Sequence, residues 1–86
     1  MLGLLFVYPT EPCYLAVLGK DTFIGEEHFF FNNLIPSLED AVSKYCIDTI
    51  IINGNIDYIS KAKQIINNKA QFDDVNVKGV LDEVTD

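Results

Sequence analysis

Three polar side chains of this sequence are the best placed to do chemistry together: Glu11, Asn53 and Asp57. Glu11 lies in a turn after one apolar run, and Asn53 and Asp57 follow another apolar run later in the chain. At one edge of a sheet they would form a weak polar pocket for a metal ion or a nucleotide, because carboxylate and amide oxygens suit hard cations. The sequence favours a plainer interpretation, in which Glu11 is a solvent-exposed turn residue and Asp57 caps a helix.

His28 is the only histidine, and it lies beside two acidic residues, Glu26 and Glu27. In a strand, residues 26 and 28 share one face and residue 27 points to the other. A histidine metal site needs at least two further well-placed ligands, and this arrangement supplies one on the same face. The pattern therefore favours an exposed histidine on a strand.

Two cysteines, Cys13 and Cys46, are far apart in the sequence. A catalytic cysteine needs a neighbouring base, and a disulfide framework needs more cysteines at closer spacing. Cys13 begins an apolar run, and Cys46 falls on the apolar stripe of an expected helix. Both are expected to be buried structural thiols in a reducing compartment.

The charge of the chain excludes several kinds of partner. The net charge is −7, and the six basic residues are all lysines. Such a chain repels a phosphate backbone and lacks arginine, the usual reader of phosphates and base edges, so we expect no nucleic-acid binding. Attraction to an anionic membrane is equally disfavoured. No motif, such as a glycine-rich phosphate loop, implies a cofactor.

The length and the apolar segments indicate one small soluble domain. The 86 residues are 49% hydrophobic, which suits a single compact core. The apolar run 2–7 lacks the positive flank and cleavage site of a secretion signal. No run approaches the roughly 20 apolar residues of a membrane span. We therefore expect a cytoplasmic location, in the host cytoplasm if the protein is viral.

The first third of the chain predicts an antiparallel meander of three strands. Residues 2–8 form a continuous apolar run, which is typical of a central strand covered on both faces. Residues 13–18 form a second apolar run after a proline-containing turn. The Gly19-Lys20-Asp21 turn then leads into a third strand, expected from residue 22 to about residue 31.

The rest of the chain predicts two helices that alternate with two strands. Ser37 is expected to cap the first helix and Asp57 the second. In chain order the expected elements are a helix at 38–46, a strand at 47–52, a helix at 58–68, a strand at 74–81 and an acidic tail at 82–86.

This β-β-β-α-β-α-β order predicts an α/β domain over residues 1–81, in which a mixed five-stranded sheet carries packed helices. The last two strands follow helices, and right-handed crossovers should make them parallel to their neighbours. The acidic tail at 82–86 is expected to lie outside this domain.

The order of elements resembles the ribonuclease H-like fold, which resolvases and the halves of actin-like ATPases share. Phe6-Val7-Tyr8-Pro9-Thr10 is similar to the end of the resolvases' first strand, where Asp-Pro-Gly follows an apolar pair. Ile51-Ile52-Asn53 is similar to the end of their fourth strand, which finishes on Glu. The resemblance implies a strand order of 3-2-1-4-5.

The resemblance also implies that the catalytic carboxylates of that family are missing. Their positions hold Tyr8 and Asn53, which offer no negative charge to a divalent metal ion at pH 7. Tyr8, Glu11, Asn53 and Asp57 would then form at most a vestigial site, with no catalytic residue and no bound metal.

Phe29, Phe30 and Phe31 are the strongest sign of an interface. In the implied strand order they lie on an edge strand, and consecutive side chains alternate between faces, so the three rings cannot all enter one core layer. Apolar edge strands template pairing with other chains. Either the first helix covers the outward ring, or another chain does, as a homodimer through edge pairing or as a larger partner.

The leading hypothesis is therefore a non-catalytic protein-interaction or assembly module. Its small size and its content of Asn and Ile would suit an accessory protein of a virus, a phage or a mobile element. One alternative is an acidic inhibitor of a basic nucleic-acid-binding protein, which would use Asp73, Asp74 and the acidic tail. The other is a degenerate ribonuclease H-like protein that binds a metal ion or a nucleotide.

Overall fold

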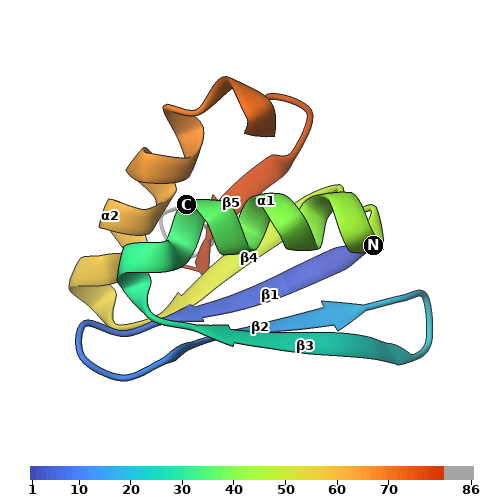
Figure 1. Cartoon of the computed structure of the whole chain (residues 1–86), viewed down its shortest axis with the longest axis horizontal. Coiled ribbons are helices and arrows are strands. Elements are labelled where there is room, and N and C mark those ends of the chain that lie inside the picture. Colours follow the sequence, from blue (N-terminus) through green and yellow to red (C-terminus); the bar gives the residue numbers. More distant parts are fainter. Residues whose placement is uncertain (81–86) are drawn as a thin grey trace.

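Five strands and two helices make up the computed structural model, which describes residues 1–80 (Figure 1). The elements are β1 (Leu2–Val7), β2 (Cys13–Leu18), β3 (Phe23–Phe29), α1 (Leu34–Tyr45), β4 (Thr49–Gly54), α2 (Ile56–Asn67) and β5 (Asn76–Gly79). Short 3₁₀ turns at Phe31–Asn33 and Ala70–Phe72 lead into α1 and follow α2. The alternation of helices and strands expected from residue 38 onward is confirmed.

The strands form one mixed sheet in the order β3-β2-β1-β4-β5. β1, β2 and β3 pair antiparallel, whereas β4 pairs parallel to β1 and β5 parallel to β4. β1 is the central strand because it pairs with β2 on one side and with β4 on the other. The order is the one that the sequence resemblance implied, and β3 is an edge strand.

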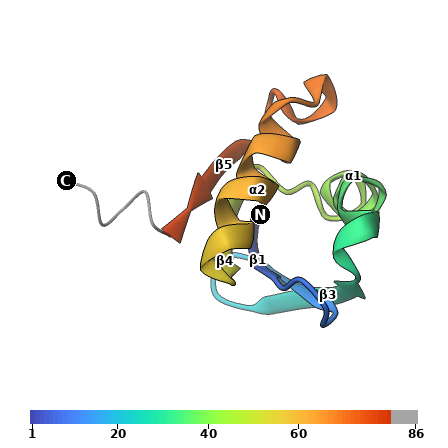
Figure 2. The same cartoon turned by 90° about the vertical axis from the view of Figure 1, so that its left-hand side faces the viewer.

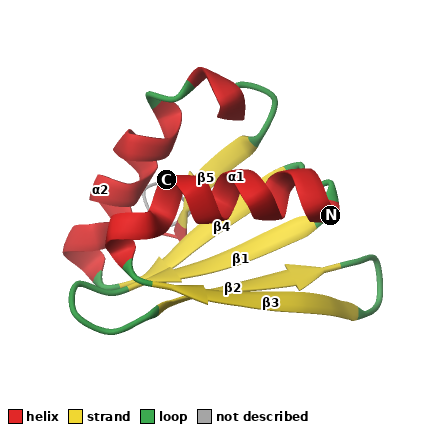
Figure 3. Cartoon of the chain, viewed as in Figure 1, coloured by secondary structure: helices red, strands yellow, loops and turns green. Residues whose placement is uncertain are grey.

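Both helices lie on the same face of the sheet, as Figures 1 and 3 show from one side and Figure 2 from another. Alternate strand residues point to this face and form the core, among them Leu5, Leu15 and Ile52, which are completely buried. Leu38 of α1 and Ile66 of α2 close the core from above. Right-handed crossovers explain the arrangement, because both of them run in the same direction across the sheet.

The opposite face of the sheet carries no helix from residues 1–80. We call it the open face. Its apolar side chains are Leu2, Leu4, Phe6, Tyr14, Ala16, Leu18, Phe23 and Ile51, and its polar margin is Glu26, His28, Thr49, Asn53 and Lys78. The expectation that β1 is covered on both faces is therefore wrong for the described part of the chain.

The first helix begins earlier than expected, and its cap differs. α1 starts at Leu34 and Asn33 is its N-cap residue, so the prediction that Ser37 caps this helix is wrong. Pro36 lies in the first turn, where backbone N–H groups have no intrahelical acceptor and a proline costs little. The helix also ends sooner, because Cys46 is its C-cap, with a left-handed φ of 55°.

The strand expected at 47–52 lies two residues later, as β4 at Thr49–Gly54. Three further boundaries shift for local reasons. Asn55, not Asp57, caps α2, because its side-chain oxygen accepts hydrogen bonds from the amides of Asp57 and Tyr58. β3 ends at Phe29, where the chain turns into a 3₁₀ segment. β5 is shorter than expected, at Asn76–Gly79, and the tail at 82–86 lies outside the described residues.

Candidate functional site

The carboxyl ends of β1 and β4 lie side by side, as a polar pocket at one sheet edge requires. Phe6 pairs with Asn53 and Val7 with Gly54, and the amide of Asn55 donates to the carbonyl of Val7 at 2.8 Å. Gly54 has a φ of +109°, and a Cβ atom at this position would overlap the backbone of Val7. Glycine is therefore required where the two strand ends approach each other most closely.

Tyr8 and Asn53 stand at this edge without forming a charged pair. The side-chain oxygen of Asn53 accepts a hydrogen bond from the backbone amide of Gly54 at 2.7 Å, so the Asn53 side chain stabilises the local turn. Tyr8 is half-buried, and its carbonyl accepts a hydrogen bond from the Cys13 thiol at 3.8 Å. Neither side chain is an anion at neutral pH, so the edge lacks the charge that holds a divalent cation.

Glu11 and Asp57 add no metal site to this edge. Both are exposed, Glu11 in the turn before β2 and Asp57 in the first turn of α2. The Asp57 carboxylate is well placed to interact with the positive end of the helix dipole. Within residues 1–80, no three His, Cys, Asp or Glu side chains gather as metal ligands would. The four residues of the vestigial site thus lie at one end of the sheet.

The cysteines have different environments. Cys13 is buried in the core as expected, and this burial raises the pKa of its thiol. Cys46 is exposed beyond the end of α1, so the prediction that it lies in the apolar stripe is wrong. The left-handed C-cap turns its side chain away from the core, and the sequence shows this poorly because glycine usually fills such positions.

His28, Glu26 and Tyr14 form a polar cluster at the margin of the open face. His28 Nε2 lies 3.0 Å from Glu26 Oε2, and the Tyr14 hydroxyl donates to Glu26 Oε1 at 3.1 Å. The hydrogen bonds from His28 and then from Tyr14 lower the pKa of the Glu26 carboxyl. Sequence reasoning placed residues 26 and 28 on one exposed face but missed Tyr14, which pairs with His28 across β2 and β3.

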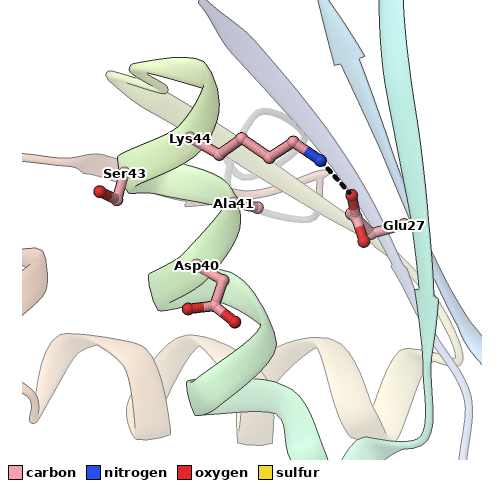
Figure 4. Close-up of a pocket in the computed structure, with 5 residues that line it drawn as sticks. All are labelled: Glu27, Asp40, Ala41, Ser43 and Lys44. Atoms are coloured by element: carbon pink, nitrogen blue, oxygen red, sulfur yellow. Dashed lines mark ion pairs between the residues drawn. The ribbon is translucent and has the colours of Figure 1, made fainter.

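A groove of about 390 Å³ lies between α1 and β3 (Figure 4). Lys44 reaches across it to Glu27 at 3.9 Å, and the Tyr45 hydroxyl donates to the same carboxylate at 3.3 Å. Ser43 points away from Glu27, so this carboxylate is not placed to activate its hydroxyl (Figure 4). These contacts hold the edge strand to the helix and assemble no catalytic group.

The three phenylalanines have three different environments. Phe29 is in the core with 8% of its surface exposed, whereas Phe30 is 55% exposed. Phe31 is half-buried and packs edge-on against the Tyr58 ring of α2, with 4.9 Å between the ring centres. The chain leaves the sheet at Phe29, so of these three rings only Phe30 is exposed, and Phe23 at the start of β3 is a second exposed ring on the edge strand.

The open face is the feature that sequence reasoning missed. Its central side chains, Leu4, Phe6 and Ile51, are half-buried. A signal for it existed in the sequence, because β1 has no polar side chain and β4 has three consecutive isoleucines, so neither strand is apolar only at alternate positions. Such strands need cover on both faces, and two same-side crossover helices supply it on one.

Fold and site together define an α/β domain with a five-stranded mixed open sheet, two helices on one face and an apolar surface on the other. No helix within residues 1–80 is long and apolar enough to cross a membrane. Comparison of the chain with protein-family models, with curated proteins and with solved structures found no match.

Proposed function

We propose that this protein is a non-catalytic interaction module that binds another protein through the open face of its sheet. The observation that carries the proposal is the continuous apolar surface of β1, β2 and β4, which no helix of residues 1–80 covers. Apolar patches of several hundred Å² are rare on monomeric proteins and usually mark interaction sites. The protein partner expected from the sequence is thus assigned to the sheet face in preference to the Phe29–Phe31 edge.

A non-catalytic role is supported by the ends of β1 and β4. We propose that the chain has a ribonuclease H-like arrangement, which its element order and strand order support. In that arrangement the metal-binding carboxylates belong where this chain has Tyr8 and Asn53. Asn53 is bonded to its own neighbouring amide, and Tyr8 carries no charge at neutral pH.

A magnesium titration tests the non-catalytic role against the metal-binding alternative. The amide signals of Glu11, Gly54 and Asp57 would be followed by NMR as Mg²⁺ is raised to millimolar concentrations. We expect only small, non-saturating shifts, because Glu11 and Asp57 are exposed to solvent and the strand ends between them carry no carboxylate. Saturable shifts confined to these residues would overturn the proposal and favour a metal-binding protein.

A pair of matched variants tests the role of the open face. Leu4→Lys puts a charge at the centre of this face, whereas Ser60→Lys puts the same charge on the exposed side of α2. Proteins cross-linked to each variant in cells that express it would be compared quantitatively with those cross-linked to the parent chain. We expect Leu4→Lys to lose specific partners, second copies included, and Ser60→Lys to keep them. Equal cross-linking by both variants would refute a binding role for this face.

A further inference from the structure

The middle row of side chains across the open face has a charge of opposite sign at each end. The strand registers align Glu26 with Ala16, Ala16 with Leu4, Leu4 with Ile51 and Ile51 with Lys78. The row therefore runs from an acid on edge strand β3, over three apolar residues, to a base on edge strand β5. Its centre is Leu4, on the central strand of the sheet.

We propose that the partner of the open face is a second copy of this chain, stacked face to face about a two-fold axis parallel to β1. This inference rests on the proposed function and names the partner. Such an axis reverses the row, so Leu4 meets Leu4 and the small Ala16 lies opposite the larger Ile51. It also places Glu26 of each copy opposite Lys78 of the other, which makes two ion pairs per dimer.

The charge pattern discriminates between the two possible axes. A two-fold axis across the strands would set Glu26 against Glu26 and Lys78 against Lys78, and like charges in contact are unfavourable. The edge strands lie about 10 Å from β1, so the usual crossing angle of about 30° between packed sheets moves the row ends apart by about 5 Å. The long, flexible stem of lysine can span that displacement.

The rows on either side of the middle one fit the same axis. Phe6 and Leu2 also lie on β1, so each meets its own counterpart in the second copy. Tyr14 and Leu18 of β2 then lie opposite Asn53 and Thr49 of β4. Aliphatic and aromatic side chains thus line the axis, and the rim is mostly polar, as in known interfaces. Phe23 of edge strand β3, which pairs with Leu18, adds one exposed ring at the rim.

The size of the face is sufficient for a specific dimer. Five strands about 4.8 Å apart and about 20 Å long present a planar footprint of roughly 480 Å². If the faces are treated as flat, two of them bury about 1,000 Å². This is about the smallest area of a specific interface. The expected dimer is therefore reversible and concentration-dependent.

Sedimentation velocity over a range of concentrations tests the dimer and its geometry together. We expect the parent chain to dimerise and Leu4→Lys to stay monomeric, because that change brings two ammonium groups together on the axis. Glu26→Lys and Lys78→Glu should each raise the dimer dissociation constant about tenfold, because two attractions become two repulsions. The double variant Glu26→Lys/Lys78→Glu should return to within about threefold of the parent, since it restores both pairs.

Matched controls separate this geometry from general effects of charge. Glu11→Lys and Lys69→Glu make the same charge changes at exposed positions outside the open face and should leave the dissociation constant nearly unchanged. Circular dichroism would confirm that every variant is folded. Dimerisation insensitive to Leu4→Lys, or single charge changes that the double variant does not rescue, would overturn the proposed stacking.

A parent chain that stays monomeric at high concentration would also overturn this inference without deciding the proposed function. In that case the cross-linking comparison of Leu4→Lys with Ser60→Lys decides whether the face binds a different protein. If Leu4→Lys still loses partners, the interaction module stands and only the second copy is excluded. If both variants cross-link alike, the interaction module falls as well.

Discussion

Glu26 is the titratable side chain whose surroundings the fold changes most visibly. His28 and Tyr14 both hydrogen-bond to its carboxylate, and neither is adjacent to it in the sequence. The acid is thereby held in its charged form at the margin of the open face, where a lysine of a second copy would meet it. The sequence alone suggested only an incomplete metal site at Glu26. The structure instead places this carboxylate, with its hydrogen bonds to His28 and Tyr14, at the edge of the open face.

The lowered pKa of Glu26 can be measured by NMR titration of its side-chain carboxyl. We expect His28→Ala to raise this pKa toward the usual value for a glutamate, and Tyr14→Phe to raise it less, because His28 is the larger cause. A lowered folded-state pKa stabilises the fold above the unfolded-state pKa, and this contribution is lost as pH falls through the folded-state value. An unchanged titration midpoint in His28→Ala would contradict the assignment.

The two cysteines should differ sharply in reactivity. Cys46 is exposed, whereas Cys13 is buried and its thiol pKa is raised, so little thiolate forms there at neutral pH. We expect a thiol-specific chromogenic reagent to modify one thiol quickly and the second only after denaturant is added. Cys46→Ser should remove the fast phase. Rapid modification of both thiols in the native protein would show that β2 is not packed as described.

At the scale of elements, one side chain caps the first turn of α2. The Asn55 side-chain oxygen accepts hydrogen bonds from Asp57 N at 3.0 Å and from Tyr58 N at 3.3 Å. The sequence suggested Asp57 for this role because aspartate is an equally good cap, and the choice between them depends on where β4 ends. β4 continues to Gly54, which leaves Asn55 at the helix boundary.

Urea denaturation of two variants separates these roles. Asn55→Ala should lower the free energy of unfolding by about 1 kcal/mol, the usual cost of losing a side-chain cap. Asp57→Asn should lower it by only about 0.3–0.5 kcal/mol, because it removes an exposed charge near the helix dipole and keeps the cap. The reverse order would mean that α2 begins where the sequence alone suggested.

The first two strands were more predictable than the start of α1, for a physical reason. Apolar runs such as residues 13–18 define strands directly, and the structure has β2 with those bounds. The start of α1 depends on a 3₁₀ turn at Phe31–Asn33 and on a proline tolerated in the first turn, which local patterns describe poorly. The two strand ends at Tyr8 and Asn53 were correctly placed together, but the hydrogen bond of Asn53 to its own neighbour was not foreseeable.

At the scale of the whole molecule, the sequence indicated the sheet and the helices but not which face of the sheet would lack helices. That result follows from strand order and crossover handedness together, and neither is encoded in a single segment. The register that aligns Glu26, Leu4 and Lys78 is likewise a property of four strand pairings at once. An interface built in this way has no sequence motif.

The net charge of −7 gives the dimer a characteristic salt dependence. The overall repulsion between two such chains acts over longer distances than the two ion pairs at the rim. The Debye length falls from about 30 Å at 10 mM salt to about 8 Å at 150 mM, so the repulsion is screened first. We expect the dimer dissociation constant measured by sedimentation to fall over this range. A rise would mean that the ion pairs dominate association.

The central position of β1 also affects how the chain is made. β1 is synthesised before the other four strands, yet one of its two neighbours, β4, follows only after β2, β3 and α1. The strands β1, β2 and β3 can pair as soon as they leave the ribosome. The face that becomes the core stays exposed to water until α1 and α2 have been synthesised. During synthesis both faces of a largely apolar hairpin are therefore bare at once, and this nascent segment is the natural target of a chaperone.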